Sequence, residues 1–349
     1  MTPRSPLRSV CALTMTVLLL PGCNDSSSRP AATPPVEAGQ TVRAAELCLG
    51  SECSQYLPLV DIPDAENLVF SDDGRLFVSG GLQVYEVSRE AGGFSAQAIA
   101  DSDCNFTGLA IQDGTLYAAC ASGELYAGQL TAAPLLSPVF SLVDMCLPNG
   151  IAIGPDRQLY VVDATLNANS QACLPPNPRI DRLAINPDNP LEIISQELWL
   201  QGSAAGGLAL GLDNQLRFPN GLRSEGSVFF GTDGGSIYAV AQLPGGAAGE
   251  VIPLYFTPTE LDDLGLLSDG ILVTDFFQGR VLLLSKTGVE LQSTDAGRFF
   301  SPSSVRLGQP PMFLPTDILV TEKGILGDNN LPLDRLSLLR RSSAPPTGG

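Results

Sequence analysis

Histidine is absent from the 349 residues of this chain. Its absence excludes Ser-His-Asp triads, zinc sites with imidazole ligands and imidazole general bases. Basic residues are also scarce, with 19 Lys and Arg against 37 Asp and Glu, which gives a formal net charge of −18. Because nucleic-acid phosphates are bound by clustered Lys and Arg, this charge argues against a nucleic-acid partner and leaves room for a cation site.

Long apolar runs are also missing beyond the N-terminus, where no stretch reaches the roughly 18 apolar residues that cross a bilayer. At the N-terminus, Arg4 and Arg8 precede an apolar segment at residues 10–20, a pattern typical of a signal peptide. The sequence Leu20-Pro-Gly-Cys23 then resembles the cleavage box of bacterial lipoproteins. We therefore expect Cys23 to become a lipid-bearing N-terminus, with an ordinary secretory signal and an incidental cysteine as the alternative.

The composition changes along the chain predict four segments. They are a signal peptide at 1–23, a polar Pro-rich tether at 24–45, a folded domain at 46–341 and a flexible tail at 342–349. This organisation predicts a bacterial cell-envelope lipoprotein that faces the periplasm and touches the membrane only through its lipid anchor. Inner and outer membrane remain open as destinations.

A repeated pair of short strands organises the folded domain. In residues 147–163, two apolar runs flank the turn Gly154-Pro-Asp156, which predicts two strands joined by a tight turn. The pattern recurs six times, each copy headed by a polar residue: Glu66, Asn105, Asn149, Asn220, Asp262 and Ser303. A repeat of about forty residues made of short strands is typical of a propeller blade. We predict an all-β fold, a six-bladed β-propeller with four-stranded blades around a central channel.

The gap between the third and fourth copies is longer than the others and needs an interpretation. Residues 179–184 and 191–194 have the character of a third and a fourth strand of the same blade. Residues 202–217, which are rich in Gly and Ala, then form an insertion. A degenerate seventh blade at this place is the alternative.

Six cysteines remain in the predicted domain, an even number that suggests three disulfides in an exported chain. Sequence alone allows 15 pairings. We favour the pairs Cys48–Cys53, Cys104–Cys120 and Cys146–Cys173, and the expected positions of the strand ends support the last two. A zinc site is the alternative, but the spacings lack the paired C-x-x-C motifs of such sites.

The six head residues are expected to converge at one end of the channel, and all are oxygen donors. Amide oxygens combined with two carboxylates suit Ca²⁺, which takes 6–8 oxygen ligands. The absence of histidine disfavours soft metals. The alternative for each head is that Asn and Asp simply favour the turn that precedes a strand.

The heads and turns resemble those of the regucalcin/gluconolactonase family, which is related in architecture to the paraoxonases. The similarity rests on Pro-Asn-Gly at 148–150 and 219–221, the Glu66 head and repeated Asp-Gly-x-Leu turns, and it covers about residues 58–340. In that family one Glu, two Asn and one Asp hold a divalent cation. The resemblance assigns those roles to Glu66, Asn149, Asn220 and Asp262. Asp263, Asn105 and Ser303 are possible supporting residues around this set.

The resemblance implies hydrolysis of a small lactone or related ester, with Asp262 as both a ligand and the general base. A metal-bound carbonyl is a better electrophile, and the bound cation stabilises the developing negative charge. Two departures qualify this expectation. A paraoxonase-type mechanism needs a histidine pair that this chain lacks, and Asn-Leu follows Glu66 where the family usually has Gly-Pro. The second hypothesis is a binding or scaffold propeller with a protein partner in the cell envelope.

Overall fold

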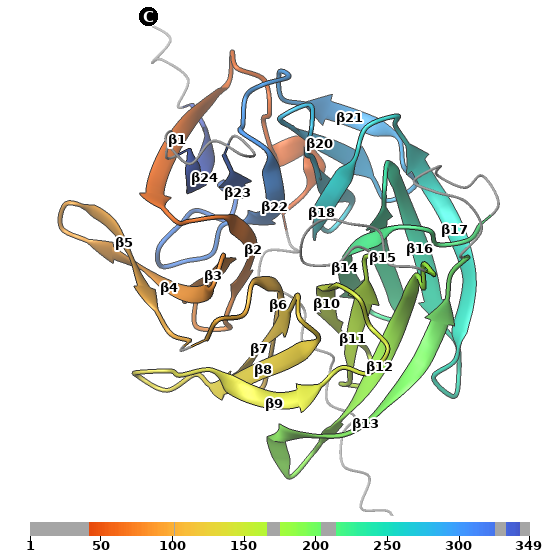
Figure 1. The fold of residues 1–349 in the computed structure, drawn as a ribbon. Coiled ribbons are helices and arrows are strands. Elements are labelled where there is room, and N and C mark those ends of the chain that lie inside the picture. The colour runs from red at the N-terminus through yellow and green to blue at the C-terminus, as the bar shows by residue number, and fades with distance from the viewer. Residues whose placement is uncertain (1–41, 101, 166–174, 204–213, 325–332, 343–349) are drawn as a thin grey trace, which may run out of the picture. The chain divides into compact units, whose positions relative to one another are not determined.

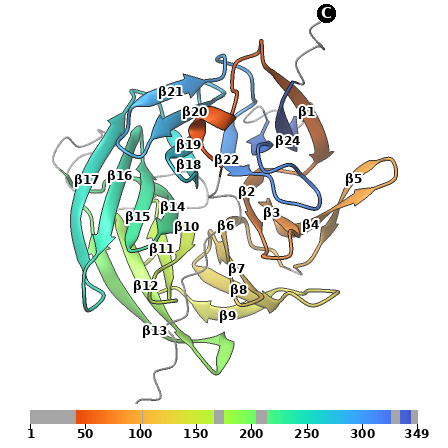
Figure 2. The ribbon, with the colours of Figure 1, turned by 180° about the vertical axis from the view of Figure 1, so that it is seen from behind.

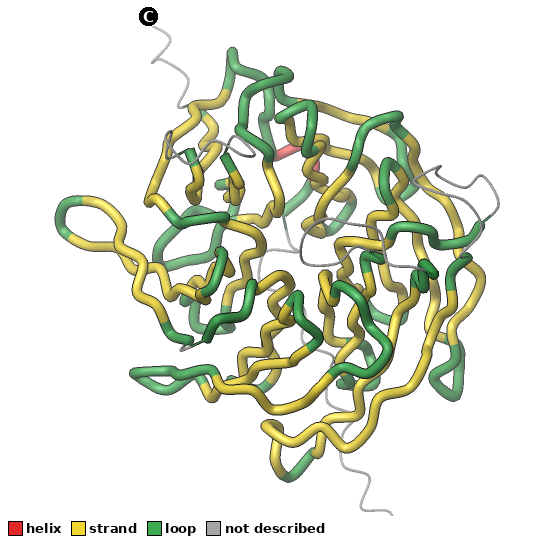
Figure 3. The backbone as a smooth tube through the Cα atoms, viewed as in Figure 1, coloured by secondary structure: helices red, strands yellow, loops and turns green. Residues whose placement is uncertain are grey.

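Short runs of β-branched, aromatic and leucine residues, separated by turns rich in Gly and Asp, form nearly all of the ordered secondary structure (Figure 3). The computed structural model describes residues 42–100, 102–165, 175–203, 214–324 and 333–342. These residues contain 24 strands and one 3₁₀ turn, η1 (Ala44–Glu46). All of them belong to one compact unit, Pro35–Gly349.

The strands form six antiparallel sheets of four strands each. Blade 1 consists of β2 (Ala65–Phe70), β3 (Leu76–Gly80), β4 (Gln83–Glu90) and β5 (Gly93–Ala98). Blade 2 consists of β6 (Phe106–Gln112), β7 (Thr115–Cys120), β8 (Glu124–Gln129) and β9 (Ser137–Ser141). Blade 3 consists of β10 (Pro148–Ile153), β11 (Leu159–Asp163), β12 (Arg179–Asn186) and β13 (Asn189–Gln201).

The remaining blades follow the same order, except that the last one includes the first strand of the chain. Blade 4 consists of β14 (Pro219–Glu225), β15 (Val228–Asp233), β16 (Ser236–Gln242) and β17 (Ala248–Phe256). Blade 5 consists of β18 (Leu261–Leu266), β19 (Gly270–Asp275), β20 (Arg280–Ser285) and β21 (Glu290–Ser293). Blade 6 consists of β22 (Pro302–Leu307), β23 (Ile318–Lys323), β24 (Asp334–Arg341) and β1 (Ser54–Asp61).

The six-bladed propeller is confirmed, with the blades arranged around a centre lined by the first strand of each (Figures 1 and 2). The third and fourth strands expected in blade 3 are present as β12 and β13. Among the described residues there is no seventh blade. Residues 204–213, inside the expected insertion, lie outside the described ranges.

The first and second strands of a blade are largely buried on both faces because each blade packs between two neighbours, as β18 and β19 show. Every residue of β19, Gly-Ile-Leu-Val-Thr-Asp, is buried, whereas β17 on the outer edge alternates with exposed positions. The core consists of apolar clusters between adjacent blades. Tyr160 and Val162 of blade 3, for example, pack with Phe229 and Tyr238 of blade 4. The near-continuous apolar runs of the second strands follow from this double burial.

The N-terminal strand β1 closes the ring by pairing with β24, from Ser54 opposite Arg341 to Asp61 opposite Arg335. This closure was not expected from the sequence. Val42 and Ala44, which fall within the expected tether, are buried in a cluster with apolar residues of blades 5 and 6. The expected signal peptide and Cys23 lie outside the described residues. Among the described residues, no helix is long and apolar enough to span a membrane.

Two of the three expected disulfides are present, Cys48–Cys53 and Cys104–Cys120. The second follows from strand pairing, because Phe106 lies opposite Cys120 in the ladder between β6 and β7. The third expected pair, Cys146–Cys173, involves a residue outside the described ranges. Disulfides stabilise mainly by restricting the unfolded chain.

Candidate metal centre

The inner strand of every blade has a register shift near its first residues. In blade 5 the shift lies between Leu261 and Leu264, so Asp262 and Asp263 have no regular partners in β19. A β-bulge of this kind leaves residues unpaired and re-aims their side chains. Each blade has one residue at the first position of its bulge. In blades 1 to 6 these residues are Glu66, Thr107, Asn149, Asn220, Asp262 and Ser303. Five of the six predicted heads therefore occupy equivalent positions.

Asn105 is the exception among the predicted heads. It precedes β6, and its backbone oxygen accepts a hydrogen bond from the amide of Ala121. Thr107 takes the equivalent position in blade 2, and its hydroxyl donates to the backbone oxygen of Pro148 at 2.8 Å. The predicted head of blade 2 thus lies two residues too early, although Gly108 follows Thr107 as Gly150 follows Asn149 and marks the equivalent position.

Hydroxyl groups on the second strands hold the heads of the next blade. The Thr232 hydroxyl donates to the backbone oxygen of Asp262 at 2.5 Å. The Thr274 hydroxyl donates to the backbone oxygen of Ser303 at 3.0 Å. Each of these threonines also accepts a backbone N–H from the bulge of its own blade. Because buried backbone groups must be paired, these bonds link the position of one bulge to the next around the ring.

The Pro-Asn-Gly motif has a steric reason. A Cβ atom on Gly150 would lie 2.2 Å from the backbone oxygen of Asn220 in the next blade. A Cβ atom on Gly108 would lie equally close to the backbone oxygen of Asn149. Only glycine allows neighbouring inner strands to approach this closely. The glycine after the head is thus a packing requirement that brings successive heads together.

Asp262 is the best-connected head. Its Oδ1 accepts a hydrogen bond from Asn220 Nδ2 at 2.7 Å, and its Oδ2 accepts one from the Ser303 hydroxyl at 2.8 Å. Its residue is 6% exposed. Burial, together with the neighbouring carboxylates of Glu66 and Glu260, raises the pKa of Asp262 well above its ordinary value. The carboxyl group is thus held in one orientation, but its negative charge is poorly compensated.

Glu66 is a second buried carboxyl group that interacts electrostatically with Asp262, and it is 7% exposed. Burial raises the pKa of its carboxyl group, although the nearby ammonium of Lys323 acts in the opposite direction. Lys323 forms ion pairs with Glu66 and, at 2.9 Å, with Asp64. Burial lowers the pKa of Lys323, but these two carboxylates outweigh it and hold the pKa above its ordinary value. Lys323 therefore stays protonated and does not serve as a base.

Asp263, expected beside the metal ligands, belongs to a separate buried cluster. Its Oδ2 accepts hydrogen bonds from Arg223 at 2.7 Å, Asn67 at 2.9 Å, Ser304 at 2.6 Å and Arg306 at 3.2 Å. Two guanidinium groups and one carboxylate thus share the interior of the ring. Such a pair network is costly to break because it leaves an unpaired buried charge.

Sequence reasoning missed Arg223, Arg306 and Lys323. The two arginines each follow a predicted head by three residues, and a basic residue inside an otherwise apolar buried strand was the available signal. Asp163 and Asp233, which end second strands, play a structural part. Their carboxylates accept backbone N–H groups from the loop before the inner strand, such as Leu147 at 3.0 Å and Arg217 at 3.0 Å.

The donor set of the heads fits a hard divalent cation. Glu66, Asn149, Asn220, Asp262 and Ser303 offer carboxylate, amide and hydroxyl oxygens at equivalent bulge positions, without nitrogen or sulfur donors. Two of them are buried carboxylates whose pKa values are raised, so an added positive charge would be stabilised there. Hydrogen bonds connect Asn220, Asp262 and Ser303, whereas Asn149 is placed by its bulge position and its backbone contact with blade 2.

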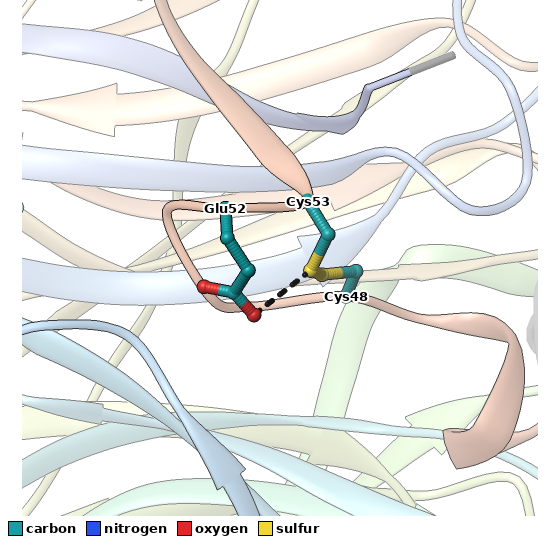
Figure 4. A group of neighbouring side chains, drawn as sticks. All are labelled: Cys48, Glu52 and Cys53. Carbon is teal, nitrogen blue, oxygen red and sulfur yellow. Dashed lines mark hydrogen bonds between the residues drawn. A yellow bond between two sulfur atoms is a disulfide. The ribbon is translucent and has the colours of Figure 1, made fainter. Parts of the chain in front are cut away.

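A second group of potential ligands, Cys48, Glu52 and Cys53, lies close together near the start of β1 (Figure 4). Its two sulfur atoms form a disulfide, and Glu52 Oε1 lies 3.4 Å from Cys53 Sγ. Metals bind the thiolate form of cysteine, which a disulfide cannot supply. This group is therefore not a metal site in the oxidised protein.

Comparison with solved structures gives the same architecture. Regucalcin from Agrobacterium tumefaciens, a calcium-binding protein, is 13% identical, with a TM-score of 0.60 over 80% of this chain and 90% of that one. A gluconolactonase from Xanthomonas campestris is 15% identical, with a TM-score of 0.61 over 87% and 94% of the two chains. A luciferin-regenerating enzyme is 13% identical, with a TM-score of 0.58 over 82% and 95%.

No protein-family model matches the sequence, and no curated protein matches it. At these identities the likeness concerns the fold. The feature behind this likeness is the propeller architecture, six sheets of four antiparallel strands each. The chain has the six-bladed propeller fold of the regucalcin and gluconolactonase structures.

Proposed function

We propose that this protein is a hydrolase of small lactones or related esters that depends on a divalent cation, with Ca²⁺ as the expected ion. The observation that carries the proposal is the buried group in which Asn220 and Ser303 both donate to Asp262, with Glu66 beside it. Glu66, Asn149, Asn220 and Asp262 would hold the cation. The solved gluconolactonase of the same fold supports the choice of substrate class.

When bound, the cation would polarise the carbonyl oxygen of the substrate. The side chains of the protein itself would orient the Asp262 carboxylate and accept a proton from the attacking water. Asn220 and Ser303 fix the two oxygens of Asp262, so this carboxylate has one orientation toward an attacking water. Asp262 takes a proton from that water as the water oxygen bonds to the acyl carbon. The acyl–oxygen bond of the ring then breaks, and the proton held by Asp262 passes to the leaving alkoxide oxygen. The two oxygen contacts cost little reorganisation because they already exist in the resting protein.

Asp262→Asn tests the proposal most directly, with Asp113→Asn as the matched control. Asp113 is an exposed aspartate in the turn between β6 and β7, and it pairs with Arg157. Calcium binding is measured by titration calorimetry, and hydrolysis is measured on a panel of five- and six-membered lactones. We expect Asp262→Asn to lose hydrolysis by at least a hundredfold, in keeping with the usual effect of general-base catalysis, while Asp113→Asn keeps it. Equal hydrolysis by wild type and Asp262→Asn would contradict the proposal.

A non-enzymatic binding or scaffold propeller in the cell envelope is the second candidate. The observation that favours it is the low exposure of the five heads at bulge positions, Glu66, Asn149, Asn220, Asp262 and Ser303. Each exposes less than a tenth of its surface, which leaves little area for a substrate. Propellers serve both roles, so the fold does not separate them. Absence of lactone hydrolysis, together with a cross-linked envelope protein that is lost on deletion of the propeller, would favour the scaffold.

We also propose that the protein is a periplasm-facing lipoprotein attached through Cys23. The support is the cleavage-box sequence and the two disulfides, which persist in oxidising compartments. In a bacterial host, the wild-type protein should fractionate with membranes and carry a lipid on its N-terminal cysteine by mass spectrometry. Cys23→Ala should appear in the soluble fraction. A wild-type protein released without lipid would favour an ordinary secretory signal instead.

A further inference from the structure

The chain contains only two lysines, Lys286 and Lys323, and one of them lies at the candidate metal centre. Lys323 ends β23, the second strand of blade 6, and its side chain is 19% exposed. Its Nζ contacts the carboxylate of Glu66 and that of Asp64, the latter at 2.9 Å. One ammonium group therefore joins the last blade to two acidic residues at the start of the first.

This contact has a direct consequence for cation binding. Glu66 is one of the four residues that would hold the divalent cation, so the ammonium and the cation share one carboxylate. Two positive charges in a buried site repel each other with little screening by solvent or salt. Cation binding is then an exchange at Glu66 rather than the simple filling of a vacant set of oxygens.

We propose that Lys323 is an internal counter-cation that competes with the divalent cation for Glu66 and thereby sets the affinity of the site. The inference rests on the proposed function, because it assumes that Glu66 is a ligand. Without the cation, Lys323 neutralises one of the buried carboxylates that Glu66 and Asp262 place close together. When the cation is bound to Glu66, the carboxylate no longer needs the Lys323 ammonium as a counter-charge, and the two positive charges repel each other.

Asp64 provides the place to which the ammonium withdraws. Its side chain is 40% exposed, and its Oδ1 already contacts Lys323 Nζ. A small rotation of the Lys323 side chain would break the contact of its ammonium with Glu66 and keep the contact with Asp64. The lysine backbone does not have to move, because its amide donates to the backbone oxygen of Ser301 at 3.0 Å and holds the strand end.

The test uses the full-length protein in soluble form and calcium chloride. The affinity for Ca²⁺ is measured by titration calorimetry. Lys323→Met removes the charge but keeps an unbranched apolar side chain. We expect its dissociation constant for Ca²⁺ to be at least tenfold lower than that of the wild type. Lys323→Arg keeps the charge and should bind no more tightly than the wild type.

Lys286→Met is the matched control. Lys286 also forms an ion pair, with Glu225 at 2.7 Å, and lies over the ring of Phe230 at 5.0 Å, away from the heads. This variant should bind Ca²⁺ like the wild type. Thermal unfolding in EDTA checks that each variant is folded.

The outcomes separate this inference from the proposed function. If the wild type binds Ca²⁺ and Lys323→Met binds equally or more weakly, the inference is overturned while the metal centre stands. If neither protein binds a divalent cation, the proposed metal centre fails and the inference fails with it. If only Lys323→Met binds, the inference is supported, because the lysine alone then keeps the cation out.

A second measurement needs no substitution at the site. With only two lysines, selective isotope labelling of lysine gives two side-chain signals in an NMR spectrum, and Lys286→Met assigns them. Addition of calcium chloride should shift the Lys323 signal and leave the Lys286 signal unchanged. Calcium binding that leaves the Lys323 signal in place would overturn the inference.

Discussion

The hydroxyl of Thr321 in blade 6 donates a hydrogen bond of 2.8 Å to the backbone oxygen of Glu66 in blade 1, 255 residues earlier in the chain. The same hydroxyl accepts the backbone N–H of Ser304, also at 2.8 Å. Both partners are buried, so the bond joins the two ends of the ring where the candidate metal centre lies. The side chain of Thr321 thus contributes both to closure of the propeller and to the placement of Glu66.

Thr321→Val should weaken both fold and site. Valine has nearly the shape of threonine but leaves the oxygen of Glu66 and the N–H of Ser304 without this partner. We expect a loss of about 1–3 kcal/mol in the free energy of unfolding, the usual cost of an unsatisfied buried polar group. Urea denaturation measures it. Thr287→Val, at a turn between outer strands, is the control and should change stability by less than about 0.5 kcal/mol.

Gly150→Ala should disturb the packing between blades 3 and 4. The added Cβ would lie 2.2 Å from the backbone oxygen of Asn220, so the inner strands must separate. Overpacking of this kind typically costs about 1–3 kcal/mol. We expect lower thermal stability together with weaker cation binding. Gly92→Ala adds the same atom where nothing lies within 4 Å, and a similar loss there would contradict the steric explanation.

The stability of the metal-free protein should respond to pH through Asp262. Burial and the neighbouring Glu66 and Glu260 raise its pKa well above the ordinary value of 3.8. Between the ordinary and the raised pKa, the folded protein keeps a proton that the unfolded chain has released. The free energy of unfolding therefore falls as pH rises through this window. Asp262→Asn removes the titrating group.

The difference in unfolding free energy between wild type and Asp262→Asn removes the contribution of titrating groups that do not interact with Asp262. It is measured by urea denaturation in EDTA at intervals from pH 4 to pH 8. We expect the wild type to lose stability relative to the variant as pH rises. Added calcium chloride should reduce that loss, since a bound cation favours the ionised carboxylate. A difference that is independent of pH would show that Asp262 ionises normally.

Removal of the two observed disulfides should have unequal effects. Cys104–Cys120 closes a sequence separation of 16, and loss of such a loop constraint costs about 3 kcal/mol. Cys48–Cys53 closes a separation of 5, for which the same relation gives about 2 kcal/mol. Double serine variants compared by thermal unfolding check the order. A larger loss from the shorter loop would point to strain or to residual structure in the unfolded chain instead.

The sequence by itself determined the repeat, the strand pairs and the number of blades. Those features depend on local properties, namely runs of apolar residues, turn residues such as Gly154-Pro-Asp156, and a period that survives in every copy. It also indicated five of the six bulge positions, because a polar head before an apolar strand is visible in a single copy. The pairing of Cys104 with Cys120 followed from the same strand pattern.

Only the tertiary structure decided the contacts that give the candidate site its electrostatic character. The ring closure through β1, the ion pair of Lys323 with Glu66 and the cluster of Arg223 with Asp263 join residues that are distant in the chain. No local pattern specifies such partners, since they depend on how six blades pack around one axis. The register of blade 2, where Thr107 and not Asn105 takes the head position, was also decided there, because both residues are polar oxygen donors beside the same apolar strand.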